Sequence, residues 1–304
     1  MPATETQPSN TPPGFLLGVD GGGSGTRARL LDPHGQRLSE GHAGPSALGQ
    51  GIEQAWVNVR LAVQHAFLAA GLSEPEWPAL AIGLGLAGAG TPSRSKAFLS
   101  LAPPCHGLAL DTDIGVALLG AHAGRPGAVV AAGTGSVGQA LRRNGQRVLV
   151  GGWGFGIGDE GGGAWMGQAA MRTAQAAMDG RAPVGTLAMG VWQLCGSRRE
   201  TLIEWCAQAG QHGFAQLAPV VFDTAGTDPA AQRVLALAAG ALADIALALD
   251  PEGELPVAIM GSIGALLLPR LPTALQQRCV RPAGDAMDGA LQLIRQRLSS
   301  DRPA

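Results

Sequence analysis

The chain has 304 residues, of which 46% are hydrophobic and 14% are charged, and its formal net charge is −2. This composition is that of a globular protein with two domains or one large one, so a disordered chain is excluded. The weak negative charge gives no electrostatic reason to expect nucleic acid or an anionic membrane as a partner. Lys96 is the only lysine and is not part of a G-x-x-x-x-G-K-[ST] pattern, so a phosphate site must use backbone N–H groups, hydroxyls, arginines or a metal.

The N-terminal half of the chain predicts alternating strands and helices. A buried strand leads through a glycine turn into a second strand, and the turn DPHG leads into a third. Apolar residues then recur at helical spacing, and Gly71 ends that helix. The expected elements are strands over 15–20 and 26–32, a helix from Ile52 to Phe67, a buried strand that runs into a Gly/Ala-rich loop within 80–90, a strand over 107–113, and a helix over 114–122. This succession is an α/β domain, in which loops at the strand ends carry the site.

The pattern begins again at residue 127. The stretch GAVVAAGTGSVGQALRR predicts another hairpin, and NGQR makes the next turn. A helix follows from Ala164, and a longer one runs from Pro229 to Leu249 with Asp228 as its N-cap. ELPVAIMGSIGALL then predicts a strand, a turn and a helix, and the last helix covers 285–298. Because each half-chain begins with a hairpin rich in glycine and hydroxyls, we expect an internal duplication with its boundary near residues 121–127.

We therefore expect an N-terminal domain over 14–122 and a C-terminal domain over 123–304, with the last helix able to pack back on the first domain. Residues 1–13 are polar and rich in proline, without the basic and apolar regions of a signal peptide, and predict a disordered tail. The four cysteines lack metal-like spacing, which indicates reduced thiols and a cytoplasmic protein. The most apolar run, 234–249, is rich in alanine and contains Asp244, so no membrane span is expected.

Two glycine turns predict a nucleotide site. Asp20 precedes the turn GGGSGT (21–26), and the strand AVVAA precedes the turn GTGS (133–136). Glycines let backbone N–H groups approach phosphate oxygens, and the hydroxyls add donors. Either turn alone is also an ordinary hairpin turn, but the pair, one in each half-chain, favours a polyphosphate ligand. A strand-end carboxylate such as Asp20 can hold Mg²⁺, usually through water.

Three further stretches carry candidate chemistry. Asp111-Thr112-Asp113 ends a strand, where a carboxylate can take the proton of a substrate hydroxyl in phosphoryl transfer; the alternative is an N-cap, and Asp113 could serve both purposes. In GGWGFGIGDEGGGAWMG (151–167), the glycines permit tight backbone against a ligand and the carboxylates could bind sugar hydroxyls, whereas a mere linker rarely contains Trp and Phe. MGSIG (260–264) is a strand–turn–helix start where backbone can approach an adenosine, although such connections are common.

In this order, these stretches resemble the BadF/BadG/BcrA/BcrD group of the actin/hexokinase/Hsp70 superfamily. The stretches that carry the resemblance are GVDGGGSGTRARL, GLGLAGAG, DTDIGVALLGAHAGRPGAVVAAGTGS, GGWGFGIGDEGGG, IMGSIGALL and RPAGDAMDGALQL, and the similarity covers nearly the whole chain after Pro13. The resemblance implies an α/β fold of two ribonuclease-H-like (actin-like ATPase) domains with an ATP and sugar cleft between them. It also implies an ATP-dependent amino-sugar kinase that phosphorylates the 6-hydroxyl of N-acetylglucosamine or glucosamine, with ATP and Mg²⁺ as cofactors and a homodimer as the assembly.

The motifs and the resemblance together assign roles to individual residues. Asp113 matches the base that activates the sugar 6-hydroxyl, and Asp20 lies where a Mg²⁺-side carboxylate is expected. The positions expected to contact ATP are Gly21, Gly22, Gly23, Ser24, Thr26, Thr134, Gly135, Ser136, Gly261 and Ser262. The positions expected to contact the sugar are Ser46, Asp113, Gly152, Trp153, Gly154, Asp159 and Glu160.

One position departs from the family pattern. Members often have an asparagine that contacts the sugar in the loop after the third strand, and here that loop is AGPSALGQG, with Ala47 at the matching position and Ser46 beside it. The departure bears on how the sugar is held and on which sugar it is. It also keeps open a non-catalytic sugar or nucleotide sensor of the same fold. A second alternative is the activator ATPase of 2-hydroxyacyl-CoA dehydratases, whose iron–sulfur cluster needs closely placed cysteines that are not evident here.

Overall fold

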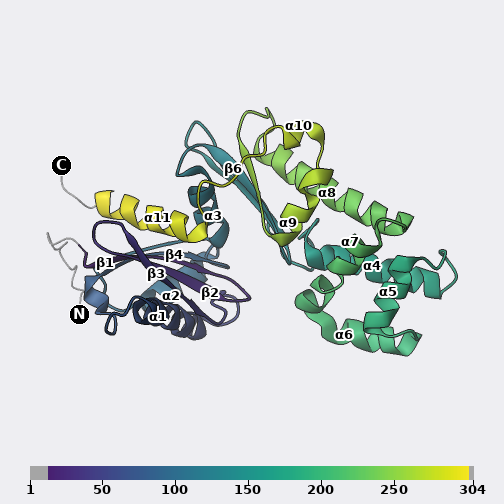
Figure 1. The fold of residues 1–304 in the computed structure, drawn as a ribbon, viewed down its shortest axis with the longest axis horizontal. Helices are drawn as coiled ribbons and strands as arrows, with labels where there is room; N and C mark the ends of the chain where they lie inside the picture. Colours follow the sequence, from purple (N-terminus) through teal and green to yellow (C-terminus); the bar gives the residue numbers. More distant parts are fainter. Residues whose placement is uncertain (1–12, 301–304) are drawn as a thin grey trace. The chain divides into compact units, whose positions relative to one another are not determined.

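The computed structural model describes residues 13–300, which form two compact units (Figure 1). Unit 1 runs to Arg125 and resumes at Arg281, and unit 2 is Pro126–Val280. The chain from Arg281 onward, with the last helix, therefore belongs to unit 1, whereas the expected domains divided the chain after residue 122. The tail expected over residues 1–13 lies outside the described residues except for Pro13.

Unit 1 is built on a five-stranded sheet in the order β3-β2-β1-β4-β5. Its strands are β1 (Phe15–Gly21), β2 (Thr26–Leu31), β3 (Arg37–Ala43), β4 (Leu80–Leu86) and β5 (Gly107–Asp111). The first three strands pair in antiparallel fashion, and β4 and β5 continue the sheet in parallel with β1. The expected hairpin and the two later strands are confirmed. Because β1, β4 and β5 are parallel, their carboxyl ends meet at one edge of the sheet.

Helices cover the sheet of unit 1 (Figure 1). α1 (Ile52–Ala69) packs on β2 and β3 through the predicted apolar face, and α2 (Pro92–Ser100) packs on α1. α3 (Asp113–His122) and α11 (Ala286–Ser300) pack against each other, and α11 also packs on β1, β4 and β5. A Cβ on Gly18 of β1 would meet the backbone of Met287, so glycine there lets α11 approach the strand closely.

Unit 2 begins with the same strand order, in a four-stranded sheet β8-β7-β6-β9. Its strands are β6 (Gly127–Ala132), β7 (Ser136–Leu141), β8 (Arg147–Gly151) and β9 (Val257–Met260). β6, β7 and β8 are antiparallel, and β9 is parallel to β6. Val257 of β9 also forms a parallel bridge with Cys279, at the place where unit 1 has β5. The repeated topology confirms the internal duplication and the two α/β, ribonuclease-H-like units expected from the sequence.

Between β8 and β9 the chain of unit 2 is helical. Its helices are α4 (Gly163–Met178), α5 (Thr186–Cys195), α6 (Arg199–Ala215), α7 (Ala218–Thr224), α8 (Pro229–Leu249), α9 (Ser262–Leu267) and α10 (Thr273–Gln276), and short 3₁₀ turns cover Trp77–Ala79 in unit 1 and Leu268–Arg270 in unit 2. α8 packs on β6, β7 and β8, while α4 contacts α5, α6, α7 and α8. The sequence predicted α4 and α8 but none of the three helices between them.

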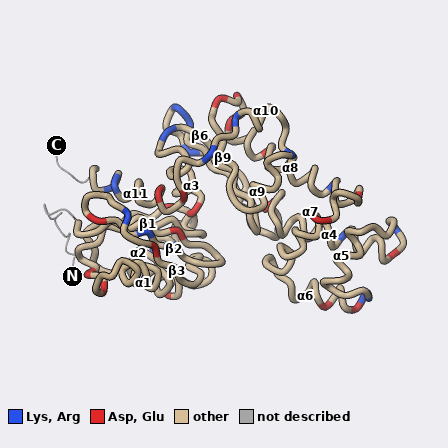
Figure 2. Tube along the Cα trace, viewed as in Figure 1, with Lys and Arg blue, Asp and Glu red and all other residues tan. Residues whose placement is uncertain are grey.

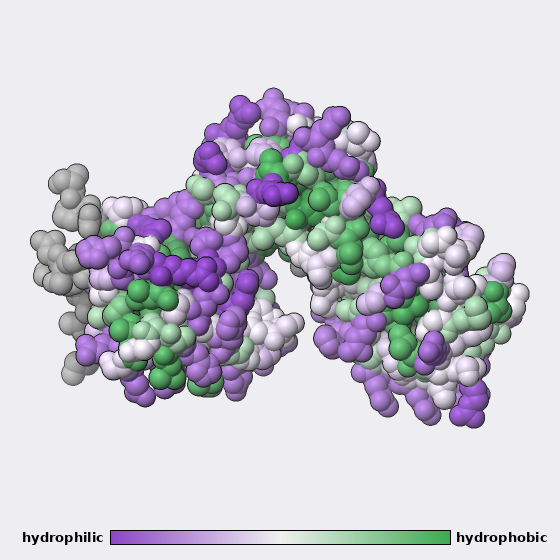
Figure 3. All heavy atoms as spheres, viewed as in Figure 1, coloured by the Kyte–Doolittle hydropathy of each residue, from purple (hydrophilic) through white to green (hydrophobic). Residues whose placement is uncertain are grey.

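α8 is the one helix in the described range that is long and apolar enough to cross a membrane. Its start is as predicted: Pro229 is its first residue, and the Asp228 carboxylate accepts a hydrogen bond from the N–H of Ala230 at 2.8 Å. Its buried side, which includes Val234 and Leu242, belongs to the main hydrophobic core of unit 2. Figure 3 shows green apolar residues along the middle of unit 2. The buried side of α8 thus forms part of this core, while Leu237 and Leu247 on the same helix are exposed.

Candidate active site

Three carboxylates gather at the carboxyl edge of the unit 1 sheet. The register aligns Asp20 of β1 with Gly85 of β4, and Gly85 with Asp111 of β5. Residues aligned across parallel strands project from the same face, so Asp20 and Asp111 share one face of the sheet. α3 begins directly after β5, and this places Asp113 at the same edge. The parallel topology therefore brings together two carboxylates that lie far apart in the sequence, as the motifs predicted.

Asp113 is a carboxyl group with a raised pKa. Burial raises its pKa, and the charges of Asp20 and Asp111 raise it further, whereas the N–H of Ile114, which donates to Asp113 Oδ1 at 2.9 Å, acts in the opposite direction. The N-cap of α3 is Thr112, whose hydroxyl accepts from the N–H of Gly115 at 3.0 Å. The alternative in which Asp113 caps the helix is therefore wrong, and its carboxylate is left for another purpose.

Asp20 is paired with an arginine that the sequence analysis did not single out. Arg27 of β2 lies directly across the hairpin from Asp20, and its Nη2 donates to Asp20 Oδ2 at 2.6 Å. Side-chain exposure is 46% for Arg27 and 21% for Asp20, so the pair faces solvent in part. Figure 2 shows charged residues of both signs over β1 and β2. The expected Mg²⁺-side carboxylate thus already has a cationic partner.

The first glycine turn presents free donors and open space. The N–H of Gly22 donates to the carbonyl of Gly25 at 3.0 Å and closes the turn. No atom lies within 4 Å of the place that a Cβ on Gly22 would occupy, and Ser24 is exposed. The N–H groups of Gly23 and Ser24 donate to no other backbone group in the described part of the chain. Such a turn can receive phosphate oxygens without rearrangement.

Two of the expected contact residues instead hold this turn in place. Thr26 and Ser46 are each only 1% exposed, and their hydroxyl oxygens lie 2.8 Å apart. Thr26 Oγ1 also donates to the carbonyl of Gly44 at 2.6 Å, and the N–H of Ser46 donates to the carbonyl of Gly22 at 3.1 Å. The loop around Ala47 is therefore fixed to the glycine turn. Direct contact of Thr26 with ATP and of Ser46 with a sugar stays a prediction.

The second glycine turn, in unit 2, is hydrogen-bonded to the first residues of α4. The N–H of Gly163 donates to the carbonyl of Gly133 at 2.8 Å, and that of Ala164 donates to the carbonyl of Thr134 at 2.9 Å. Thr134 is exposed, and its hydroxyl has no hydrogen-bond partner among the described residues. Space is open around Gly133, where no atom lies within 4 Å of a Cβ. Ser136 differs, because its buried hydroxyl donates to the carbonyl of Glu160 at 2.6 Å.

Asp159 lies beneath this second turn. It is 6% exposed and has a φ of +61°, a conformation that residues other than glycine rarely adopt. Its carboxylate accepts from the N–H of Ser136 at 3.4 Å and from Gln211 Nε2 at 2.9 Å, and a Cβ on Gly135 would lie 2.5 Å from its Cγ. Burial raises the pKa of Asp159, as does the charge of Glu160, while the Ser136 N–H opposes both. Asp159 therefore positions the turn, and its contact with a sugar stays a prediction.

The other amino acids expected to contact the sugar lie in the loop between β8 and α4. Trp153 is 75% exposed, and Glu160, next to Asp159, is also exposed. Gly152 and Gly154 have φ values of +71° and +86°, which favour glycine at both positions. The N–H of Gly152 donates to the carbonyl of Ser136 at 3.2 Å, so this loop and the second glycine turn are joined.

Gly261 connects β9 to α9 at the same end of the unit 2 sheet. Its φ is +84°, and a Cβ there would meet the carbonyl oxygen of Ala132, which ends β6. Only glycine fits this close approach. Ser262 follows with an exposed side chain. The backbone at Gly261 thus lies next to the strand that leads into the second glycine turn.

The donor set fits Mg²⁺ only as part of a metal–nucleotide complex. No group of three or more His, Cys, Asp or Glu side chains among the described residues could hold a metal ion. Mg²⁺ at phosphoryl-transfer sites, however, takes one or two carboxylates together with substrate phosphates and water. Asp20, whose charge acts on nearby Asp113, supplies such a carboxylate beside the open turn at Gly22.

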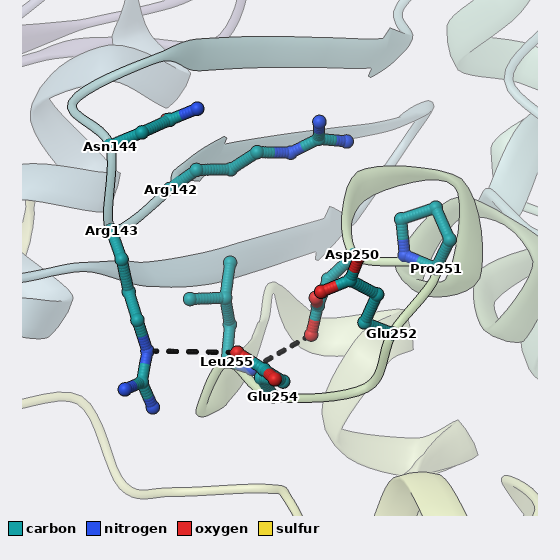
Figure 4. A pocket seen from close by; sticks show the side chains of 8 residues that line it. All are labelled: Arg142, Arg143, Asn144, Asp250, Pro251, Glu252, Glu254 and Leu255. Atoms are coloured by element: carbon teal, nitrogen blue, oxygen red, sulfur yellow. Dashed lines mark hydrogen bonds and ion pairs between the residues drawn. The ribbon is translucent and has the colours of Figure 1, made fainter.

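A separate cavity of about 320 Å³ lies in unit 2 (Figure 4). Its lining residues come from the β7–β8 turn and from the segment after α8: Arg142, Arg143, Asn144, Asp250, Pro251, Glu252, Glu254 and Leu255. Arg143 approaches Glu254 at 3.9 Å, and the N–H of Leu255 donates to Asp250 Oδ2 at 2.7 Å. None of the candidate site residues lines this cavity, so it is distinct from the site predicted here.

Comparison with known proteins bears directly on the candidate residues of both units. The BadF/BadG/BcrA/BcrD ATPase family matches residues 17–266, a range that includes both glycine turns, Asp113 and Gly261. This chain belongs to the BadF/BadG/BcrA/BcrD ATPase family. The resemblance drawn from the motifs is confirmed, and membership of this ATPase family implies the use of ATP.

Two curated relatives and one solved structure are similar over most of the chain. Glucosamine kinase GspK of Vibrio cholerae is 34% identical over 278 residues, which is 91% of this chain and 94% of that protein. N-acetyl-D-glucosamine kinase of Dictyostelium discoideum is 28% identical over 81% of this chain and 84% of its own length. A crystal structure from Chromobacterium violaceum, described as a candidate N-acetylglucosamine kinase, is 43% identical with a TM-score of 0.91, covering 93% of this chain and 100% of that one.

Proposed function

We propose that this member of the family is an ATP-dependent amino-sugar kinase that transfers the γ-phosphoryl group to the 6-hydroxyl of N-acetyl-D-glucosamine or D-glucosamine. The observation that carries the proposal is the similarity over more than nine-tenths of the chain to a glucosamine kinase, with 34% identity. The 43% identical structure described as a candidate N-acetylglucosamine kinase supports the same substrate class. The cleft between domains that the resemblance implied, and the residue roles below, stay predictions.

In this proposal both glycine turns bind the phosphates of ATP. The free N–H groups of Gly23 and Ser24, and the exposed hydroxyl of Thr134, are suitable donors. The Gly261 backbone contacts the adenosine. Mg²⁺ carried at Asp20 would neutralise charge on the phosphate oxygens when the nucleotide is bound. These donors position the γ-phosphoryl group, and positioning supplies much of the rate in this class of reaction.

Asp113 acts as the general base. The oxygen of the sugar 6-hydroxyl attacks the γ-phosphorus, the bond to the β–γ bridging oxygen breaks, and ADP leaves with that oxygen. The proton of the hydroxyl passes to the Asp113 carboxylate. Because burial and the neighbouring carboxylates raise its pKa, Asp113 is a stronger base than an exposed aspartate, as this role requires.

The sugar contacts come from the loop between β8 and α4. The backbone at Gly152 and Gly154, the indole of Trp153 and the Glu160 carboxylate are exposed or partly exposed there. Ala47 offers no amide to the sugar, so these groups carry more of the recognition than in relatives with asparagine at that position. We further propose a cytoplasmic homodimer.

Two glycine substitutions test the phosphate site without changing the fold. Gly22→Ala and Gly133→Ala are expected to raise the Kd for ATP at least about tenfold, because each methyl group fills space reserved for phosphate. Neither glycine has a positive φ and neither Cβ meets an atom, so the melting temperature should stay close to that of the wild type. Isothermal titration with ATP and thermal melting measure both quantities.

The matched control is Gly226→Ala. A Cβ on this glycine would also lie in free space, and its φ is not positive, but it lies in the turn between α7 and α8. Unchanged ATP affinity in both Gly22→Ala and Gly133→Ala, with the control also unchanged, would show that phosphates do not approach these turns.

The proposed function is tested by ADP release against a sugar panel. We expect ADP formation to depend on sugar, with kcat/KM for N-acetylglucosamine or glucosamine exceeding that for glucose by at least about tenfold. The same comparison distinguishes the two amino sugars. ATP binding without sugar-dependent ADP release for any member of the panel would instead support the non-catalytic sensor.

A further inference from the structure

The two arginines of β2 differ sharply in their surroundings. Arg29 is 7% exposed and is held by three carboxylates, those of Glu40, Asp285 and Asp288. Arg27, two residues earlier on the same face of the strand, is nearly half exposed, and among the described residues its one ion-pair partner is Asp20. Arg29 is therefore fixed in place, whereas Arg27 needs to give up only its ion pair with Asp20 to move.

Arg27 is also placed where a phosphate needs a cation. It follows Thr26 directly after the glycine turn, and it lies across the hairpin from Asp20. The open space at Gly22 and the free N–H groups of Gly23 and Ser24 belong to that same turn. The chain has one lysine, Lys96 on α2, so its other strongly basic side chains are all arginines.

The two groups of the ion pair prefer different parts of a metal–nucleotide ligand. A carboxylate prefers a divalent cation, and a guanidinium prefers phosphate oxygens, which it can bind through two parallel N–H bonds. Partly exposed pairs such as Asp20–Arg27 are weak, because water competes for the charges. Exchange of one weak pair for two stronger contacts is therefore favourable.

We propose that Arg27 is the cationic phosphate-binding residue of the nucleotide site, and that its pair with Asp20 is the nucleotide-free state of that site. When a nucleotide binds, the Arg27 guanidinium would leave Asp20 for phosphate oxygens, and the Asp20 carboxylate would then be free to hold the metal. This inference rests on the proposed kinase only for the use of ATP, which family membership already implies.

The test is equilibrium binding, measured without sugar and without turnover. Arg27→Ala is expected to weaken Mg·ATP binding by about tenfold to a hundredfold in isothermal titration, and to leave adenosine binding unchanged. Arg27→Lys should recover part of the loss, because it restores the charge but not the bidentate geometry. Unchanged adenosine binding also shows that the variant is folded.

The control for charge is Arg37→Ala. Arg37 is also exposed and paired with one carboxylate, Glu40, but it starts β3 opposite Leu31, at the far end of the hairpin from Thr26. We expect its affinity for Mg·ATP to match the wild type. If Arg27→Ala binds Mg·ATP within about twofold of the wild type, Arg27 is not a phosphate ligand.

A double-mutant cycle tests the exchange itself. Asp20→Asn should strengthen binding of ATP in the presence of EDTA, because Arg27 is released from its competing partner. This gain should disappear in the Asp20→Asn/Arg27→Ala double variant. If the double variant keeps the whole gain in ATP affinity, the gain comes only from removing the negative charge of Asp20, which repels ATP. The proposal that Arg27 exchanges Asp20 for phosphate would then be wrong. Failure of the kinase proposal looks different: no sugar then stimulates ADP release, whatever the ATP affinities are.

Discussion

Asp113→Asn is expected to lower kcat with the preferred amino sugar by about 10²–10⁴-fold, the usual contribution of a positioned general base. Asparagine keeps the size of the side chain and can still accept the hydrogen bond from the N–H of Ile114. It cannot take the proton of the sugar hydroxyl. KM for ATP should change little, because the adenosine and phosphate donors lie elsewhere. A coupled assay of ADP release measures both quantities.

The same substitution should not destabilise the protein. Burial raises the pKa of Asp113 above its unfolded value of about 3.9, so the folded state binds the proton more tightly than the unfolded state does. Stability therefore falls as pH rises from the unfolded to the folded pKa, and the charged group destabilises the fold at neutral pH. Asp113→Asn removes this cost, and its melting temperature at neutral pH should equal or exceed that of the wild type.

The control for Asp113→Asn is Asp244→Asn, a charge removal at an exposed position on α8. It should leave both kcat and the melting temperature unchanged. An Asp113→Asn variant that is as thermostable as the wild type and keeps more than about a tenth of kcat would rule out Asp113 as the base.

Arg29→Met is expected to lower the free energy of unfolding by about 2–4 kcal/mol, the largest stability effect that we predict. The buried guanidinium donates to Glu40 at 2.8 Å and to both oxygens of Asp285, and it also binds Asp288. Methionine would leave three carboxylates facing one another. The expected loss is at the lower part of the range for buried pairs because Asp285 and Asp288 are partly exposed, at 36% and 46%.

This cluster fixes the start of α11 on unit 1. The N–H of Asp285 donates to Asp288 Oδ2 at 3.0 Å, and the N–H of Asp288 donates to Asp285 Oδ1 at 3.1 Å. The reciprocal bonds form a capping box at the first turn of the helix, and Arg29 binds both of its carboxylates. Loss of Arg29 should therefore loosen the helix start, which amide hydrogen exchange at residues 286–290 can detect.

The effect of Arg29→Met should depend on pH. Burial acts to raise the pKa of Asp285, but the hydrogen bond and charge of Arg29, together with the N–H of Asp288 and the charge of Arg27, outweigh it, and the pKa is lowered. A lowered pKa contributes stability above the unfolded value of about 3.9 and loses it as pH falls through the folded value. The free energy of unfolding in urea should thus differ most between wild type and Arg29→Met at neutral pH, and the difference should shrink in acid.

Arg37→Ala serves as the control here as well, since its exposed pair with Glu40 is expected to contribute less than about 1 kcal/mol. If Arg29→Met lowers the free energy of unfolding by no more than Arg37→Ala does, the cluster around Arg29 does not stabilise the fold.

Much of the fold could be predicted because its signals are local. The helical spacing from Ile52 to Phe67, the Asp228-Pro229 helix start and the two glycine hairpins each depend on near neighbours in the sequence. The helices between α4 and α8 gave no comparable signal: α6 is interrupted at Gly210, whose φ is +53°, and α7 has only seven residues. The return of the last helix to unit 1 was among the expectations, but the point at Arg281 where the chain crosses back depends on tertiary packing, which a local pattern does not contain.

The sequence predicted where the candidate site residues lie in the fold, but not the burial and hydrogen-bond partners of each side chain. Strand ends and glycines placed Asp20, Asp113 and both turns correctly at the ends of the sheets. The burial of the Thr26 and Ser136 hydroxyls was missed, because it depends on the loops that fold over them. The partner of Asp20 could have been found, since a turn over 22–25 places position 27 directly across the hairpin. Thr112 as the N-cap of α3 was hidden by the two acidic residues beside it.

The central claim is phosphoryl transfer from ATP to the 6-hydroxyl of an amino sugar, and its most direct test is the structure of the product. The wild-type protein is incubated with Mg·ATP and N-acetyl-D-glucosamine or D-glucosamine, and the mixture is analysed by phosphorus and proton NMR. We expect one phosphomonoester on the sugar O6, formed in equal amount with ADP, and no product from the corresponding 6-deoxy sugars. Release of ADP and inorganic phosphate at the same rate with and without sugar, or phosphorylation at another hydroxyl, would contradict this account.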